Sequence, residues 1–231
     1  MFNEIKEIYN LRKNAIIKRL QEFEQVWQQG TEEDIFSEMA FCLLTPQSKA
    51  KICWKAILKL KEKDLLLKGA PEQVEQELSG VRFKERKSTF VVTARKFFPV
   101  RPLIKQFNPP HLTSPARGEE YNAGIFADAQ NGNNIYKCRE WLVANVKGYG
   151  YKEASHFLRN IGFGENLTIL DRHILKNLHL LKVIEDIPQS LTKTKYMQIE
   201  KAMKDFAIQI EIPIAHLDIV FWSKESGEIF K

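Results

Sequence analysis

The amino-acid sequence predicts an all-α protein. Apolar residues recur at three- and four-residue steps along most of the chain, which is the period of an amphipathic helix. Segments in which apolar and polar residues alternate, as they do in half-buried strands, are nearly absent. The chain has 231 residues, of which 44% are hydrophobic, so it can form one globular unit or two small lobes that share a cleft.

Five helices are predicted in the first hundred residues, over 5–27, 35–44, 48–67, 71–78 and 83–98. Gly30 ends the first helix, and Thr31 with Asp34 forms the capping-box pattern that starts the second. The second helix is apolar on most of its sides, so we expect it at the centre of the core. Pro46 breaks this helix and permits the third to start from Gln47, because a proline at a helix boundary loses no intrahelical hydrogen bond.

The fifth helix carries a run of basic residues and is followed by a segment without helical period. The basic residues are Lys84, Arg86, Lys87, Arg95 and Lys96. Such a run most often forms a solvated face, and contact with DNA is the less favoured alternative. Between 99 and 134 the density of proline and glycine predicts a long loop.

Five more helices are predicted after this loop, over 135–144, from 151 onward, over 171–181 and 192–210, and from 214 onward. Gly148 and Gly150 separate the first two of these helices and predict a tight hairpin, since glycine tolerates positive φ and close backbone approach. Asp171 stands where the N-cap of the third helix is expected. Pro213 marks the start of the last helix.

Composition narrows the class of protein. Lysine and arginine outnumber the acidic residues by 35 to 29, a net charge of +6 that favours a polyanionic partner but is common in proteins that bind none. No apolar run is long enough to cross a membrane, and the N-terminus lacks the pattern of a signal peptide. We therefore expect a soluble intracellular protein, located in the cytoplasm, with no membrane association.

Cysteine and histidine spacing argues against a metal site. Cys42, Cys53 and Cys138 form no C-x-x-C pair, which argues against a zinc ribbon, a disulfide framework and an iron–sulfur cluster. We expect reduced thiols in the core. The five histidines, among them His173 and His179, show no metal-ligand spacing.

The residues with the most specific chemistry lie between 145 and 174, in the sequence NVKGYGYKEASHFLRNIGFGENLTILDRHI. A hairpin that opens into a helix is a natural anion site, because the first N–H groups of a helix lack partners and its dipole is positive there. Lys152 lies in this first turn, where the dipole and partial burial disfavour the ammonium form and favour a neutral, nucleophilic amine. Asp171 follows nineteen positions later. The alternatives are an ordinary exposed lysine and an ordinary N-cap aspartate.

The whole stretch resembles the helix-hairpin-helix DNA glycosylase superfamily. The segments VKGYGYKEASHFLRNIG and LDRHI are similar to its short, archaeal-type 8-oxoguanine DNA glycosylase/AP lyase branch. The resemblance implies that Lys152 attacks the sugar C1′ to form a Schiff base, and that Asp171 stabilises charge on the sugar and moves protons. It also implies that Gly148 and Gly150 frame backbone N–H groups that bind a DNA phosphate, with a monovalent cation often held on the hairpin carbonyls. The spacing to Asp171 is one residue longer than is usual in the family, and we place the extra residue in the loop 162–167.

The C-terminal segment LDIVFWSKESGEIFK resembles the part of the family that holds the damaged base. A base must leave the helical stack before an enzyme can act on it, and is then held by stacking and by hydrogen bonds to its edge. The resemblance implies that Trp222 stacks on the base, that Asp218 contacts its edge, and that Lys231 helps to distinguish 8-oxoguanine from guanine. The alternatives are an ordinary core tryptophan and a solvent-frayed terminus.

Two more segments are assigned to the base pocket. Gln47 and Ser48, in LLTPQSKA, carry amide and hydroxyl groups that can read a purine edge. Phe83, in VRFKERK, is the expected second stacking face. Helix capping and core packing explain these three residues equally well.

The sequence thus predicts a bifunctional repair enzyme that excises 8-oxoguanine and cleaves the abasic site by β-elimination. Residues 31–130 form one lobe, and residues 1–30 and 131–231 form the other, which contains the hairpin 145–152. Double-stranded DNA containing 8-oxoguanine lies in the cleft between the lobes, and we expect a monomer without a cofactor. The alternatives are a non-catalytic helix-hairpin-helix DNA-binding module, which has no use for Lys152, and a glycosylase for a different damaged base.

Overall fold

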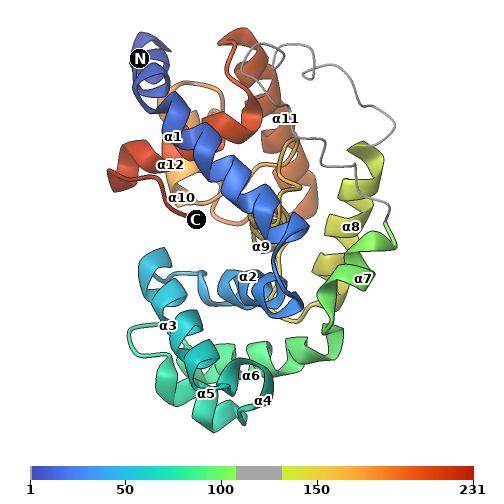
Figure 1. The fold of residues 1–231 in the computed structure, drawn as a ribbon. Coiled ribbons are helices and arrows are strands. Elements are labelled where there is room, and N and C mark those ends of the chain that lie inside the picture. The colour runs from blue at the N-terminus through green and yellow to red at the C-terminus, as the bar shows by residue number, and fades with distance from the viewer. Residues whose placement is uncertain (1, 108–131) are drawn as a thin grey trace.

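The computed structural model describes residues 2–107 and 132–231, and within these ranges every regular element is a helix (Figure 1). The elements are α1 (Phe2–Gln28), α2 (Glu32–Leu44), α3 (Ala50–Glu62), α4 (Leu65–Lys68), α5 (Pro71–Glu77), α6 (Lys84–Ala94), the 3₁₀ turn η1 (Arg95–Phe97), α7 (Val100–Lys105), α8 (Gly132–Asn145), α9 (Tyr151–Asn160), α10 (Arg172–Leu180), α11 (Lys193–Gln209) and α12 (Ile214–Ser226). The predicted all-α class is confirmed.

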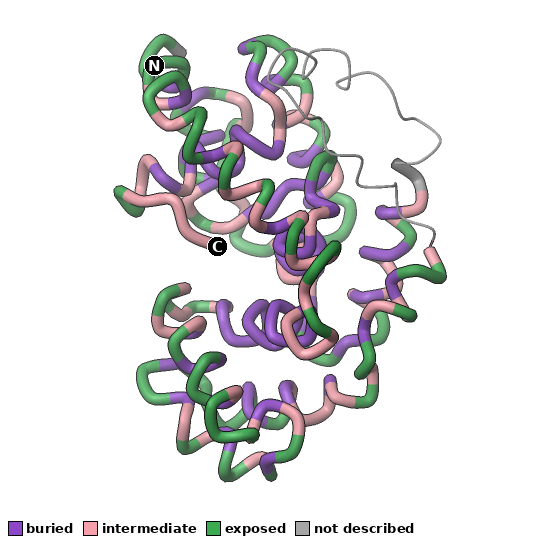
Figure 2. The backbone as a smooth tube through the Cα atoms, viewed as in Figure 1, coloured by how far each residue is buried: buried purple, intermediate pink, exposed green. Residues whose placement is uncertain are grey.

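The second helix, α2, lies at the centre of the molecule, as predicted. All ten residues from 35 to 44 are buried, and α2 appears as a continuous buried segment in Figure 2. Its start is the predicted capping box: the Asp34 N–H donates to Thr31 Oγ1 at 3.2 Å, and the Thr31 N–H donates to Asp34 Oδ2 at 2.9 Å. These bonds satisfy two of the amides that a helix start leaves without a partner.

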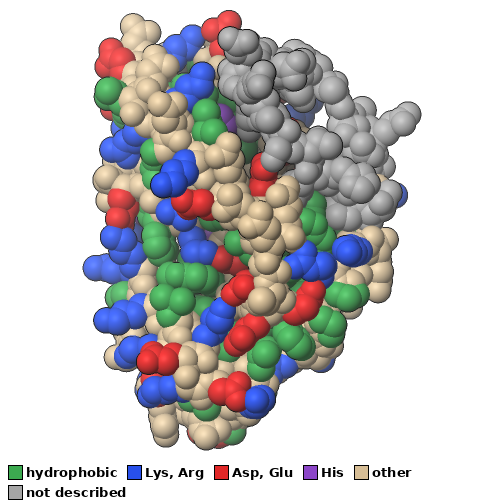
Figure 3. Space-filling model, in the orientation of Figure 1, with side chains coloured by type: hydrophobic (Ala, Val, Ile, Leu, Met, Phe, Trp, Pro, Cys, Tyr) green, Lys and Arg blue, Asp and Glu red, His purple; other side chains and the backbone are tan. Residues whose placement is uncertain are grey.

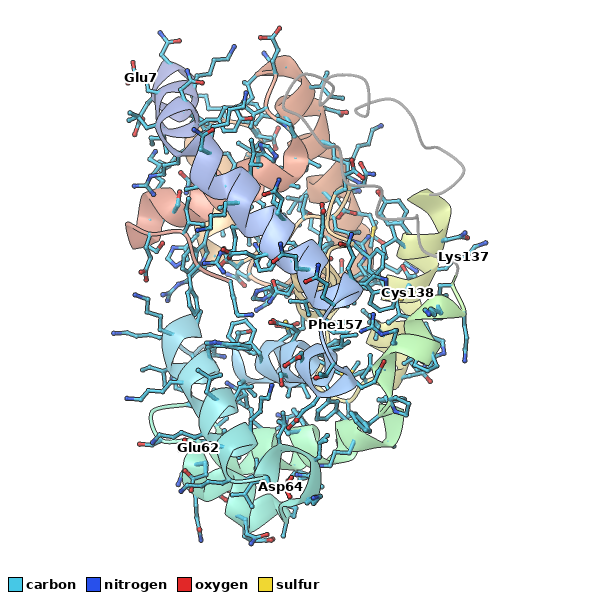
Figure 4. The ribbon with its side chains drawn as sticks, viewed as in Figure 1. Glu7, Glu62, Asp64, Lys137, Cys138 and Phe157 are labelled. Carbon is cyan, nitrogen blue, oxygen red and sulfur yellow. The ribbon has the colours of Figure 1, made fainter. Side chains whose placement is uncertain are left out.

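Two hydrophobic clusters form the interior. The first cluster consists of buried residues of α2 to α9 and the loop after α9, from Ile35 to Leu167. The second cluster joins α1 to α10, α11 and α12, from Ile5 to Phe221. Phe157 of α9, labelled in Figure 4, is fully buried in the first cluster. Helices α8 and α9 therefore pack with the first cluster, and the lobe boundaries drawn from the sequence stay a prediction.

The segment 48–67, predicted as one helix, forms two helices, α3 and α4, and the first of them starts later than predicted. This helix begins at Ala50, so Gln47 and Ser48 lie in the preceding turn and not in a helix. It ends at Glu62, and Asp64 adopts a left-handed backbone with φ of 56° before α4. A left-handed residue cannot continue a right-handed helix, which is why the apolar period of this segment spans two elements.

The predicted loop 99–134 contains one helix, α7, that the sequence pattern missed. Pro102 lies in the first turn of α7, where its missing N–H has no intrahelical acceptor to lose. Prolines in this segment were therefore compatible with a helix start. Residues 108–131 of the predicted loop lie outside the described residues, and 132–134 are not loop, because α8 begins at Gly132.

Two residues of the basic run, Lys87 and Arg95, donate hydrogen bonds to backbone carbonyls. The predicted solvated face is wrong for these two residues. Lys87 is 4% exposed, and its Nζ donates to the carbonyls of Leu44 and Pro46 at 2.7 Å each. Burial lowers the pKa of Lys87. Arg95 donates from Nη2 to Leu65 O at 2.7 Å and from Nη1 to the Gly69 carbonyl at 2.6 Å. Each cation satisfies carbonyls at the end of a helix, where the dipole is negative.

No single helix in the described part of the chain has the length and apolar character needed to cross a membrane. Helices α11 and α12, which meet at a bend of 97°, reach those limits only when they are counted together.

The three cysteines are free and buried, as expected. Burial raises the pKa of Cys53 to about 11 and that of Cys138, labelled on α8 in Figure 4, to about 12. Burial also raises the pKa of Cys42 well above its usual value. Because the thiolate is the reactive form, raised pKa values and burial both slow alkylation.

We predict that iodoacetamide leaves all three thiols of the folded protein unmodified at about pH 8, where an ordinary thiol reacts readily. Mass spectrometry of the intact protein measures the extent of alkylation. The same reagent should modify every cysteine once guanidinium has unfolded the chain. Rapid alkylation of the folded protein would show that at least one thiol is accessible.

Candidate active site

The predicted hairpin is present between α8 and α9, from Val146 to Gly150. The Val146 N–H donates to Leu142 O at 2.9 Å, and the Tyr149 N–H donates to Val146 O at 3.0 Å. Tyr149 is buried, and its hydroxyl donates to the backbone carbonyl of Met39 in α2 at 2.9 Å. The hairpin is therefore attached to the central helix by a buried hydrogen bond.

Both hairpin glycines are explained by their surroundings. Gly148 has φ of +99°, and a Cβ there would lie 2.5 Å from Phe90 Cδ2 and 3.1 Å from Leu43 Cδ2. Gly150 is the N-cap of α9, and its N–H donates to Glu153 Oε2 at 3.1 Å. Only glycine combines the positive φ with such close packing at position 148.

Lys152 is the second residue of α9, in the first turn after the hairpin. Its side chain is 20% exposed, so the predicted partial burial is confirmed. Its Nζ lies 3.0 Å from Glu153 Oε1, and the other oxygen of Glu153 holds the Gly150 amide. One carboxylate thus fixes both the amine and the start of its helix.

Asp171 is the N-cap of α10, as predicted. Its Oδ1 accepts hydrogen bonds from the His173 and Ile174 amides at 2.8 and 2.9 Å. Both capping bonds use Oδ1, so Oδ2 is the oxygen that remains for a substrate. The carboxylate is also partly exposed. The capping role is therefore confirmed, and the catalytic role expected for Asp171 stays a prediction.

Asp218 lies behind the Asp171 segment and is only 3% exposed. Its Oδ2 accepts from Arg159 Nη1 at 3.1 Å, and its Oδ1 accepts from the Ile169 N–H at 3.1 Å. Burial raises the pKa of Asp218 to about 6, although the charge of Arg159 opposes this shift. Asp218 thus fixes the backbone two residues before Asp171, and the base contact expected for it stays a prediction.

A chain of polar side chains continues from Arg159 and was not found from the sequence. Arg159 donates from Nε and Nη2 to Asn160 Oδ1 at 3.2 and 3.1 Å. Asn160 Nδ2 donates to Glu38 Oε2 at 2.9 Å. The available signal was the position of Glu38 and of the pair Arg159-Asn160 within apolar stretches, since a charge on a buried face needs a partner.

Gln47, Ser48 and Phe83 lie on two turns that touch each other. Ser48 Oγ accepts from the Arg82 N–H at 3.0 Å and from Lys87 Nζ at 3.1 Å, which joins the turn before α3 to the turn before α6. Gln47 and Phe83 both have positive φ, 55° and 58°, and Phe83 is 57% exposed. Strained, exposed residues of this kind cluster at binding sites. Their roles in base recognition stay predictions.

The C-terminal segment lies against the rest of the protein and is not frayed. Lys231 has a side chain that is 12% exposed, its Nζ makes an ion pair with Glu38, and it lies 3.6 Å from the centroid of the Trp54 ring. Trp222 on α12 is partly exposed. Lysine and arginine side chains gather along the left edge of the face shown in Figure 3, from the level of α12 to that of α3. This edge carries the positive charge that a polyanion requires.

No group of three or more histidine, cysteine, aspartate or glutamate residues among those described could hold a metal ion. The monovalent cation expected on the hairpin carbonyls stays a prediction.

Comparison with known proteins identifies relatives along the whole chain. The sequence model of the 8-oxoguanine DNA glycosylase family with the helix-hairpin-helix element matches residues 16–212. A Fusobacterium nucleatum protein named 8-oxoguanine DNA glycosylase/AP lyase is 43% identical, with 100% of this chain and 97% of the relative covered. A Methanocaldococcus jannaschii protein of the same name is 31% identical, with 100% and 99% covered.

Solved structures give the same result. The 8-oxoguanine DNA glycosylase of Thermotoga maritima matches with a TM-score of 0.81 at 28% identity, covering 100% of this chain and 98% of that one. The Methanocaldococcus jannaschii 8-oxoguanine glycosylase/lyase, in complex with a 15mer DNA containing 8-oxoguanine, matches with a TM-score of 0.80 at 30% identity, covering 98% and 99%.

The packing around Gly148 predicts a large cost for a single methyl group. Gly148→Ala should lower the free energy of unfolding by about 2–5 kcal/mol, because it combines positive φ with overpacking against Phe90. Gly227→Ala is the matched control, since Gly227 also has positive φ, +81°, but nothing lies within 4 Å of an added Cβ. The control should lose about 1 kcal/mol. Urea unfolding measures both, and equal losses would rule out the contribution of packing.

Proposed function

The chain belongs to the 8-oxoguanine DNA glycosylase family, and we propose that it removes 8-oxoguanine from DNA and cleaves the strand at the resulting abasic site. Family membership and the names of full-length relatives support both activities. The observation that carries the assignment on this chain is the partly exposed amine of Lys152, in the first turn after a glycine hairpin. A DNA-binding hairpin needs its glycines but has no use for a nucleophile there.

Lys152 is the nucleophile of this proposal. Its Nζ lone pair attacks C1′ of the sugar while the bond from C1′ to the base breaks, and the base leaves with that electron pair and takes up a proton. An ammonium has no lone pair, so its proton must leave first, and Glu153 Oε1 at 3.0 Å is within reach to accept it. Loss of a second proton leaves a neutral amine on C1′, whose lone pair forms the C=N bond of the protonated imine as the bond from C1′ to the ring oxygen O4′ breaks and O4′ takes up a proton. Removal of a proton from C2′ then expels the 3′ phosphate by β-elimination.

Asp171 supplies negative charge and a proton-transfer group. Positive charge develops on the sugar as the base departs, and a fixed carboxylate stabilises it without reorganising. The two capping bonds on Oδ1 hold this carboxylate in place. In this proposal Oδ2, which makes no capping bond, exchanges protons with the sugar.

The remaining assignments concern recognition of the DNA. In this proposal Gly148 and Gly150 present backbone N–H groups to a phosphate, and Trp222 stacks on the extruded base. Asp218 and Lys231 read its edge, while the turn residues Gln47, Ser48 and Phe83 complete the base pocket. A Methanocaldococcus jannaschii relative is described in complex with DNA containing 8-oxoguanine, which supports a duplex with this lesion as the partner. We further propose a monomer that acts in the cytoplasm without a resident cofactor.

The nucleophile assignment predicts the result of borohydride trapping. Wild-type protein incubated with a duplex carrying one 8-oxoguanine should form a covalent adduct when the imine is reduced, and Lys152→Gln should form none while still binding the duplex. Lys193→Gln is the matched control, because Lys193 is also a first-turn lysine paired with a glutamate, at 2.8 Å from Glu140 Oε2. The control should give the wild-type yield on a denaturing gel. An adduct that persists in Lys152→Gln would assign the nucleophile elsewhere.

The role of Asp171 predicts a loss of rate without a loss of structure. Asn is also a favoured N-cap, so Asp171→Asn should keep α10 intact while the single-turnover excision rate falls about 10²–10⁴-fold. Asp34→Asn makes the same change at the start of α2 and should leave the rate unchanged. Circular dichroism verifies the helices. Wild-type excision by Asp171→Asn would limit the residue to capping.

A further inference from the structure

The last residues of the chain cross from one hydrophobic cluster to the other. Gly227 ends α12 in a left-handed conformation, which turns the chain back towards the rest of the protein. Ile229 packs against the second cluster, and the next residue, Phe230, packs against the first. Figure 1 accordingly shows the C-terminal end between α12 and α10 on one side and α2 and α3 on the other. The segment 227–231 therefore connects the two halves of the molecule.

The side chain of Lys231 occupies a prepared environment at the end of this crossing. Its Nζ makes an ion pair with Oε1 of Glu38, which is 2% exposed, and lies against the face of Trp54 at 3.6 Å from the ring centroid. The second oxygen of Glu38 accepts the hydrogen bond from Asn160 at 2.9 Å. A carboxylate on one side and an aromatic face on the other leave the ammonium little freedom, and both interactions strengthen where water is excluded.

Lys231 is the cation in direct contact with Glu38. Glu38 is the only charged residue in the stretch 35–44 of α2, which is buried along its whole length. An unpaired carboxylate in such a position is strongly unfavourable, so the ion pair with Lys231 accounts for its presence. Asn160 carries no charge, and Arg159, the other cation that acts on Glu38, donates its hydrogen bonds to Asp218 and Asn160.

We propose that Glu38 is the positioning residue that fixes Lys231 for recognition of the damaged base, and that it thereby contributes to the choice of 8-oxoguanine over guanine. This inference rests on the proposed function. Glu38 acts through Lys231 and does not touch the substrate. Cleavage at a preformed abasic site requires Lys152 but no base, so it does not depend on Glu38 in the same way.

The test compares two single-turnover rates, excision of 8-oxoguanine and cleavage of a preformed abasic site. Glu38→Gln should lower the ratio of the first rate to the second by about tenfold or more, and Lys231→Met should lower it equally. In the double variant the ratio should fall no further, because both changes remove one interaction. Glu228→Gln breaks the exposed pair between Glu228 and Lys51 (2.5 Å) on the same segment and should keep the ratio within about twofold.

Three outcomes would overturn the proposal: an unchanged ratio in Glu38→Gln, losses that multiply in the double variant, or an equal effect of Glu228→Gln. If Glu38→Gln does not fold, Trp54→Leu replaces it, since this change removes the ring face beside Lys231 and leaves the buried carboxylate in place. The ratio should again fall in Trp54→Leu and should not fall further when Lys231→Met is added.

A second measurement needs no activity. Acetylation of lysine side chains by an N-hydroxysuccinimide ester, followed by mass spectrometry, should modify Lys231 at least about fivefold faster in Glu38→Gln than in the wild type, because a paired, buried amine reacts slowly. Lys51, which is 62% exposed, should react equally in both. Wild-type protein that fails to excise 8-oxoguanine would defeat the proposed function, whereas equal labelling of Lys231 in both proteins would defeat the role of Glu38.

Discussion

The burial of α2 at the centre of the molecule is the constraint on which the site depends. No residue from 35 to 44 is more than 2% exposed, and three of the attachments that shape the site end on this helix. Tyr149 fixes the hairpin to the carbonyl of Met39, and Lys87 binds the carbonyl at the end of α2. Glu38, in the middle of α2, makes an ion pair with Lys231. A rigid, fully packed helix is a suitable frame for such attachments, because close-packed interiors do not deform continuously.

In the segment before Asp171, buried carboxylates accept the backbone hydrogen bonds that regular secondary structure would otherwise satisfy. Residues 167–170 have no regular hydrogen-bond ladder, yet they are buried. The Thr168 N–H donates to Glu200 Oε1 at 3.1 Å, and the Ile169 N–H donates to Asp218 at the same distance. Buried amides must find acceptors, and here two carboxylates supply them.

Each of these carboxylates has an arginine partner that compensates its charge. Arg139 holds Glu200 at 2.8 Å, and Arg159 holds Asp218 at 3.1 Å. Burial alone would raise the pKa of Glu200, but the hydrogen bonds and the charge of Arg139 outweigh it and lower that pKa. Loss of one member of such a pair leaves an uncompensated buried charge, which typically costs about 3–5 kcal/mol. The backbone before Asp171 is thus fixed by pairs whose members come from distant helices.

The contrast between local and distant partners explains what the sequence could predict. Three features involve residues only a few positions apart, so the local sequence predicts them: the capping box of Thr31, the N-cap role of Asp171 and the glycine hairpin. Lys87 illustrates the opposite case. It was assigned to a basic, solvated face because its own helix gives no sign that its amine reaches carbonyls some forty positions earlier. Glu38, paired with Lys231 almost two hundred positions later, was missed for the same reason.

The placement of Lys152 and Asp171 at two successive helix starts follows from what a helix start provides. A side chain there stands on backbone fixed by the helix, while the neighbouring amides are still available as donors. At α10 the carboxylate of Asp171 uses these amides itself, and so becomes rigid through one oxygen. At α9 the amide of Gly150 is taken by Glu153, whose other oxygen contacts Lys152. At both helix starts a carboxylate therefore accepts a hydrogen bond from a backbone amide. At α10 it orients the carboxylate of Asp171 directly, and at α9 it orients a second acid that contacts the amine of Lys152.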